Sequence, residues 1–367
     1  MKELNYNDIC VSEISGRYIN YDHLNEFINA LPPEFKIKEE GKSVRSESIK
    51  SIEFGNGSHR ILMWSQMHGN ESTTTKAAID LLNYFKKDST HINEILKACT
   101  IKIIPILNPD GARVYTRVNA NRIDLNRDAQ DLTQPESRIL KRVYENFKPD
   151  FCFNLHDQRT IFNVGNTNKP ATVSFLAPAF DAERNNSPSR EISMQLIAAM
   201  NSKLQEEIPG QVGRYDDGFN ANCVGDAFQM KKTPTILFEA GHYRIDYNRD
   251  ITRGYIFKAL LKALDTIVYD KIQEYTVKQY EAIPENGKQF VDILVLNPDF
   301  HVNKLTKSGI VAIQYKEVLK DKKLEFVPGL HVFEKEPTEI FGHKTLNCND
   351  EKDMEWLRSN DLLNLLV

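Results

Sequence analysis

The chain has 367 residues, of which 41% are hydrophobic and 27% charged, an ordinary composition for a globular protein. Its net charge is −4 and no basic stripe is present, so we expect no nucleic-acid partner. The N-terminus lacks a secretory signal and no run of about 18 apolar residues occurs, so we expect neither export nor a membrane span. The five cysteines are scattered without a CxxC pair, which favours a reducing compartment and a cytoplasmic location.

Strands and helices alternate along most of the chain. Apolar runs predict strands at 35–37, 49–54, 60–67, 100–106, 150–155 and 235–238. Apolar residues at helical spacing predict helices at 72–87, 135–147, 189–207 and 249–271. The segment 108–111, Asn-Pro-Asp-Gly, is a turn signal. Such alternation predicts an α/β domain whose mixed, largely parallel sheet carries helices on both faces.

The pattern changes after about Tyr275. Three segments then predict strands separated by Pro and Gly, and a short helix follows, at 290–296, 310–315, 324–333 and 350–358. We therefore predict a catalytic domain over 1–274 and a small β-rich module over 275–367. Three roles stay open for the module: covering the mouth of a site, mediating dimerisation, or bracing the sheet. Homo-oligomerisation is open as well.

Polar side chains gather where the predicted strands end, and open α/β sheets bind ligands at that edge. His68 and Glu71 follow the strand 60–67, and His156 closes the strand 150–155. Two imidazole nitrogens and one carboxylate oxygen suit a catalytic zinc ion that keeps a fourth position open for water. Taken singly, each residue more readily fits a plain structural role, such as a carboxylate favoured at a helix start.

Two further polar clusters follow the same rule. Glu239 ends the strand 235–238, where a carboxylate is costly without a partner or a task. Beside a metal it could act as a general base, and the alternative is an ion pair with Arg244. The segment 117–127 offers three arginines, an Asp and an Asn. Arginine forks bind carboxylates through two hydrogen bonds, and the alternative is a solvated basic loop.

The order of the clusters carries more information than any one of them. The chain has HGNE at 68–71, NPDG at 108–111, RVNANRIDLNR at 117–127, LH at 155–156 and FE at 238–239. This order resembles that of the zinc metallocarboxypeptidases related to carboxypeptidase A, over about residues 65–253. The run at 117–127 is most similar to the regulatory carboxypeptidases. The resemblance implies a zinc carboxypeptidase-like fold for the first domain.

The resemblance also implies a metal site. One zinc ion per chain would be bound by His68, Glu71 and His156. Asp124 would accept a hydrogen bond from His68 and so fix the tautomer and orientation of its ring.

The same resemblance implies the groups that bind and cut the substrate. Asn126 and Arg127 would bind its free carboxylate, and Arg117 would stabilise the oxyanion. Glu239 would be the general base for zinc-promoted attack of water on the amide. Tyr215 would be the mobile tyrosine of the family.

Three functions remain open. The first is a metallocarboxypeptidase that removes a C-terminal residue or cleaves a small peptide such as a murein fragment. The second is a zinc deacylase of N-acyl amino acids, similar to the succinylglutamate desuccinylase and aspartoacylase group, which also has a C-terminal β module. Arg122, which stands where carboxypeptidases often have glycine, and Arg159 suit an acidic substrate there. The third is a non-catalytic binding module, and the presence of Glu239 argues against it. The expected partner is a peptide or small amide with a free carboxylate.

Overall fold

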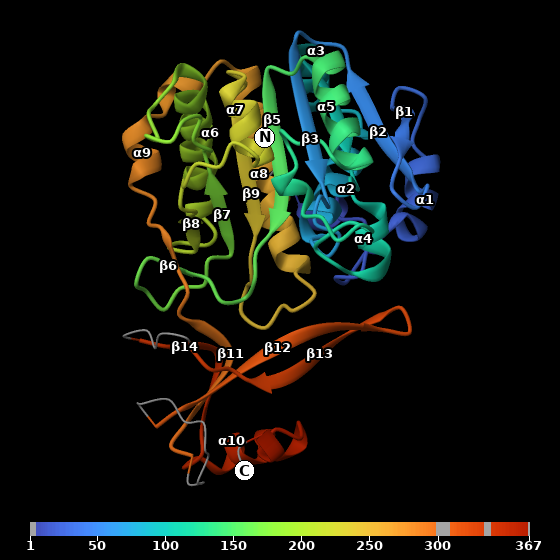
Figure 1. The fold of residues 1–367 in the computed structure, drawn as a ribbon. Helices are drawn as coiled ribbons and strands as arrows, with labels where there is room; N and C mark the ends of the chain where they lie inside the picture. The colour runs from blue at the N-terminus through green and yellow to red at the C-terminus, as the bar shows by residue number, and fades with distance from the viewer. Residues whose placement is uncertain (1–4, 299–308, 334–338, 366–367) are drawn as a thin grey trace.

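The computed structural model describes residues 5–298, 309–333 and 339–365, and its main body is an eight-stranded sheet covered by helices (Figure 1). The strand order is β1-β2-β4-β3-β5-β9-β7-β8. The pairs β3–β4, β3–β5, β5–β9 and β7–β8 are parallel, whereas β1–β2, β2–β4 and β7–β9 are antiparallel. The strands are β1 (Lys36–Lys42), β2 (Ser48–Gly55), β3 (His59–Ser65), β4 (Cys99–Ile104), β5 (Phe151–Asp157), β7 (Val173–Leu176), β8 (Val212–Arg214) and β9 (Thr235–Ala240). The predicted fold class is confirmed.

Helices cover both faces of this sheet. Side chains of a strand alternate between its faces, so an apolar strand needs helices to pack against on both sides. In β3, Ile61 and Met63 belong to one hydrophobic core, whereas Leu62 and Trp64 belong to another. The first core includes residues of α1 (Tyr21–Asn29), α2 (Thr73–Phe85), α3 (Thr90–Ala98), α6 (Pro188–Gln205) and α8 (Asp250–Val268). The second includes residues of α5 (Pro135–Phe147) and α7 (Val224–Met230).

The segment predicted as a turn at 108–111 instead begins a short helix, α4 (Pro109–Val114). The side chain of Asn108 accepts a hydrogen bond from the backbone N–H of Gly111, 2.9 Å away, and so caps the helix. Proline at the first helical position fits because its missing N–H would have no partner there. Asn108 and Pro109 therefore form the start of a helix where the sequence predicted a turn.

A second sheet has the order β13-β12-β11-β14, with β11 antiparallel to β12 and parallel to β14. Its elements are β11 (Phe290–Leu296), β12 (Val311–Lys320), β13 (Lys323–Leu330), β14 (Phe341–Asn347) and the helix α10 (Glu351–Ser359). Along the chain, α9 (Val277–Glu281) and β10 (Asn286–Gly287) come between the strands of the two sheets, and β10 pairs with β6 (Asn163–Val164) of the first domain. Short 3-10 helices span Tyr6–Asp8, Leu125–Arg127 (η2), Ile272–Glu274 and Leu363–Leu365. The domain boundary near residue 274 stays a prediction.

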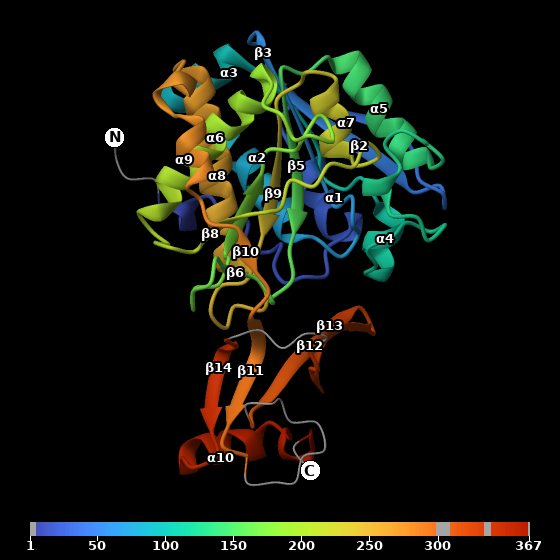
Figure 2. The same ribbon diagram turned by 60° about the vertical axis from the view of Figure 1, so that its left-hand side comes forward.

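The second sheet lies beyond the carboxyl ends of β3, β5 and β9 in both views of the ribbon (Figures 1 and 2). α10 packs on the side of this sheet away from the first domain (Figure 1). Among the described helices, none is both long and apolar enough to cross a membrane.

Candidate active site

Three buried side chains converge where β3 and β5 end. His68 lies just beyond β3, Glu71 just before α2, and His156 near the end of β5. Nδ1 of His68 is 2.8 Å from Oε1 of Glu71, and Nδ1 of His156 is 2.8 Å from Oε2 of Glu71. One possible ligand atom from each residue lies within 4.8 Å of the others. The structure thus brings together the three residues predicted to bind zinc.

The chemistry of this group fits a metal ion. The two Nδ1 atoms are 3.1 Å apart and face the same carboxylate, so a cation between them would meet three donors at once. Nε2 of His68 lies 3.0 Å from Oδ1 of Asp124, and a hydrogen bond there leaves Nδ1 with its lone pair. Although burial opposes ionisation, the two imidazoles hold the pKa of Glu71 well below its usual value. Its carboxylate is therefore charged and ready to bind a cation.

Glu239 lies on β9 directly opposite His156 in the parallel pair β5–β9. Its Oε2 is buried and has no hydrogen-bond partner among the described residues. Among the described residues no ion pair joins Glu239 to Arg244, whose guanidinium lies 5.2 Å from the centre of the Tyr243 ring. Burial, followed by the charges of Glu71 and Asp157, raises the pKa of Glu239 well above its ordinary value. A carboxyl group in this position holds a proton more tightly than an exposed glutamate does.

Asp124 and Arg117 brace the metal-binding group. Asp124 caps η2 and accepts hydrogen bonds from Nε of Arg117 at 3.1 Å, as well as from His68. Arg117 also lies 3.3 Å from Oε1 of Glu71, while 47% of its side chain stays exposed. The Arg117 guanidinium is therefore at the rim of the group, held by two carboxylates. Its predicted role at the oxyanion stays a prediction.

The predicted carboxylate-binding residues lie on η2. Oδ1 of Asn126 accepts a hydrogen bond from the backbone N–H of Val224 at 3.2 Å, so its amide nitrogen is the group left to donate. Arg127 is exposed, and its Nη1 lies 2.7 Å from Sγ of Cys223. Both contacts tie the segment to the start of α7. Its binding of a substrate carboxylate stays a prediction.

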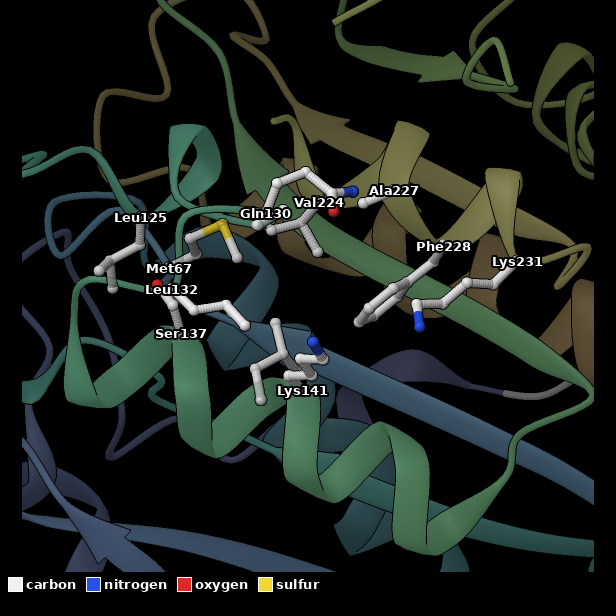
Figure 3. A pocket seen from close by; sticks show the side chains of 12 residues that line it. Met67, Leu125, Gln130, Leu132, Ser137, Lys141, Val224, Ala227, Phe228 and Lys231 are labelled. Atoms are coloured by element: carbon white, nitrogen blue, oxygen red, sulfur yellow. The ribbon is translucent and has the colours of Figure 1, made fainter. Parts of the chain in front are cut away.

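A pocket lies behind this segment, between α5 and α7 (Figure 3). Its lining includes the apolar side chains of Met67, Leu125, Leu140, Val224 and Phe228 and the polar ones of Gln130, Ser137, Lys141 and Lys231. None of the predicted metal-binding or catalytic residues lines it, so the pocket is beside the site rather than part of it.

Tyr215 directly follows β8, and its ring packs on Phe162 with 5.3 Å between the ring centroids. Burial, with the charges of Glu239 and Glu71, raises the pKa of Tyr215 far above its ordinary value. The phenol therefore lies within electrostatic reach of the site. That it moves over a substrate stays a prediction.

Two buried arginines near the site were not predicted. Arg17 forms an ion pair with Glu317 of the second sheet, and Nη1 of Arg249 donates to the backbone oxygen of Ala240 at 2.7 Å. Nε of each has no partner among the described residues. Arg249 also acts electrostatically on Glu239. Neither arginine lies in a recognisable motif, so the sequence carried no indication of them.

Known proteins provide an independent comparison. A family model described as zinc carboxypeptidase matches residues 21–224. "Probable carboxypeptidase 2" of Arthroderma benhamiae is 29% identical over 203 residues, which are 53% of this chain and 36% of that protein. The chain thus covers only about a third of the length of this relative.

Solved structures agree on the fold. A metallo-carboxypeptidase from Burkholderia cenocepacia aligns with a TM-score of 0.53 at 16% identity, over 68% of this chain and 69% of its own. Carboxypeptidase A of Helicoverpa armigera gives a TM-score of 0.53 at 16% identity, over 72% of this chain and 80% of its own. At such identities the likeness concerns the fold alone.

Proposed function

The chain belongs to the zinc carboxypeptidase family, and from this premise we propose that it is a metallocarboxypeptidase that releases the C-terminal residue of a peptide. The observation that carries the proposal is the buried Oε2 of Glu239, which has no partner among the described residues, on the strand next to the one that carries His156. A proton acceptor next to a metal-binding set is what hydrolysis of an amide requires.

His68, Glu71 and His156 are the residues that would hold one zinc ion, and Asp124 would keep the His68 ring in place. When bound, zinc supplies Lewis acidity, which polarises a carbonyl group and makes nearby water more acidic.

Glu239 would take a proton from the attacking water and later deliver it to the leaving amine. Its raised pKa suits both steps, because the group must accept and release a proton within one turnover. Arg117, at the rim, would donate hydrogen bonds to the carbonyl oxygen as negative charge develops there. To do so it would exchange its present contact with Glu71 for one with the substrate.

Asn126 and Arg127 would bind the terminal carboxylate of the substrate, since an amide N–H and a guanidinium are both donors. Tyr215 would cover the bound residue from the opposite side. The substrate is then a peptide or small amide with a free carboxylate next to the bond that is cut.

The proposal is tested by metal analysis together with a substrate panel. We expect about one zinc per chain, lost in His68→Ala. Peptides with a free C-terminus should be cleaved, and amidated peptides should lose about 10- to 100-fold in kcat/KM, the effect of losing hydrogen bonds to a charged group. Arg127→Met should remove this difference. Arg122→Met, which changes an exposed arginine in the same segment, is the matched control.

Two outcomes would contradict the proposal. Cleavage of N-acyl amino acids without cleavage of peptides would make the protein a deacylase. Absence of both zinc and turnover would leave a binding module.

A further inference from the structure

The second sheet contacts the first domain at the loops that follow the strands of the site. Thr160, in the loop after β5, accepts a hydrogen bond on Oγ1 from Gln314 at 2.7 Å. Its backbone oxygen lies 2.7 Å from Nε2 of His343. In the loop after β9, the hydroxyl of Tyr247 donates to Asp292 at 3.0 Å. The second sheet therefore holds the loops that follow both His156 and Glu239.

The hairpin of β12 and β13 reaches further across this edge. Glu317 pairs with Phe326 across the hairpin, and Tyr315 lies two residues from Glu317, so the three side chains share one face. The rings of Tyr315 and Phe326 each lie 5.2 Å from the ring of Tyr247 in the first domain. This face of the hairpin is therefore turned toward the first domain.

Glu317 makes the contact closest to the site. Its Oε2 accepts a hydrogen bond from the hydroxyl of Tyr115 at 2.5 Å, and its Oε1 lies 3.1 Å from Nη1 of Arg17. Although burial opposes ionisation, Arg17 and Arg249 hold the pKa of Glu317 below its ordinary value. A half-buried carboxylate held by a hydroxyl and a buried guanidinium is a fixed contact, unlike an exposed ion pair.

The partners of Glu317 are also neighbours of the site. Arg17 interacts electrostatically with Glu71, and Arg249 with Glu239. Tyr115 precedes Arg117 by two residues. The hairpin thus contacts a buried arginine that acts electrostatically on Glu71 and a tyrosine two residues from Arg117.

We propose that the β12–β13 hairpin is a wall of the substrate cleft, fixed by Glu317, and that it restricts the enzyme to short peptides. The proposal deepens the carboxypeptidase function and rests on it. The hairpin stands beyond the carboxyl ends of β3, β5 and β9, the edge of the large sheet at which the site lies (Figures 1 and 2). A peptide whose terminal carboxylate reached Arg127 would then meet the hairpin on one side. A few residues would fit in front of it, whereas a long or folded chain would collide with it.

The test compares peptides of three and ten residues that share the same C-terminal dipeptide. In the wild type we expect kcat/KM to fall at least about tenfold from the shorter to the longer peptide. Glu317→Gln keeps the shape but removes the charge, and should reduce that difference about fivefold. Glu325→Gln is the matched control, since Glu325 lies on β13 of the same hairpin but is exposed. It should leave the difference unchanged.

Amide hydrogen exchange measures the contact itself. In Glu317→Gln the amides of β12 and β13 should exchange faster, and those of β5 should not. Should this variant fail to fold, Tyr115→Phe removes one of the two contacts of Glu317 and serves the same comparison.

The chain-length dependence decides the proposal. If it is the same in the wild type and in the folded variant, the proposal is overturned, whatever the exchange shows. If the wild type cleaves both peptides equally well, the wall does not limit the substrate. If no peptide is cleaved at all, the carboxypeptidase function fails and this proposal falls with it, an outcome distinct from the other two.

Discussion

The site at the edge of the large sheet and the joint between the two sheets both bury acidic groups, but they satisfy them differently. At the site, Oε2 of Glu239 is buried and has no partner among the described residues, and burial followed by the charge of Glu71 raises the pKa of this group. At the joint, Asp292 is buried as well, yet it accepts hydrogen bonds from three donors: the Tyr247 hydroxyl, the Gln314 amide and the Tyr315 N–H. Burial alone therefore does not mark a functional carboxyl group. The missing partner of Oε2 distinguishes Glu239 from Asp292, because most buried polar groups of a fold are hydrogen-bonded.

The comparison predicts the largest effect for the unsatisfied group. In Glu239→Gln we expect kcat to fall about 10³-fold, within the range for loss of a general base. The zinc content should be unchanged, because Glu239 is not one of the three converging ligands. Steady-state kinetics and metal analysis measure both quantities. A fall of less than about tenfold would contradict a role in proton transfer.

Asp292, whose carboxyl group has hydrogen-bond partners, should instead affect the free energy of unfolding, and this effect should depend on pH. Burial raises the pKa of Asp292 from 3.8 to about 6. The folded state thus binds this proton more tightly than the unfolded state, so the contribution is present below about pH 4 and lost as the pH rises through 6. Two pKa units correspond to roughly 3 kcal/mol. We expect the unfolding free energy of the wild type relative to Asp292→Asn to fall by up to this amount between pH 4 and pH 7.

His343 in the same joint explains why the variant must be compared with the wild type at each pH. Burial lowers the pKa of His343 to about 4, so its contribution is lost as the pH falls from 6.5 toward 4. The two groups oppose each other in the wild type, and Asp292→Asn leaves the contribution of His343 alone. Denaturant unfolding across the pH range measures the difference. A difference that does not vary with pH would mean that Asp292 stays ionised and hydrated.

More residues of the site than of the joint between the two sheets could be predicted from the sequence, and the reason is physical. His68 and Glu71 lie in one short segment, and Asp124, Asn126 and Arg127 in another, so their spacing is visible in the sequence. The contact of Glu317 with Arg17 joins opposite ends of the chain. Nothing near either residue distinguishes it from an exposed charge, and only the assembled fold brings them together.

The fold shows the same limit. Long helices such as α5 and strands such as β11 were predicted because their apolar periodicity is local. The nine-residue helices α1 and α3 were missed, since helices of that length owe their stability to packing. β14 was missed as well. It pairs in parallel with β11, and such a pairing of distant segments leaves no local pattern.

A smaller effect is expected at Asp124, which serves the site but is itself satisfied. Asp124→Asn keeps an acceptor for His68 but removes the charge that holds the ring and Arg117. We expect the affinity for zinc to fall about 10- to 100-fold, measured by competition with a chelator. Asp128→Asn is the control, since this buried residue accepts from Thr133 and Gln134 of the same loop and lies away from the metal-binding set. Equal losses in both variants would indicate a general effect of the loop.

The smallest effect is expected at Arg122, whose charged side chain is exposed. Arg122 has a φ of +62°, a left-handed conformation that costs a residue with a Cβ about 1–2 kcal/mol. Glycine adopts this conformation freely but loses more entropy on folding, so Arg122→Gly should stabilise the protein by no more than about 1 kcal/mol. Denaturant unfolding measures the gain, and KM for peptides ending in Glu or Leu measures the loss of the cation. If KM rises for the Glu peptide alone, the arginine recognises acidic substrates and offsets its conformational cost in that way. If neither KM changes, the Arg122 charge is solvated and has no role in substrate binding. A charged group without a protein partner would then indicate a function only where it is buried.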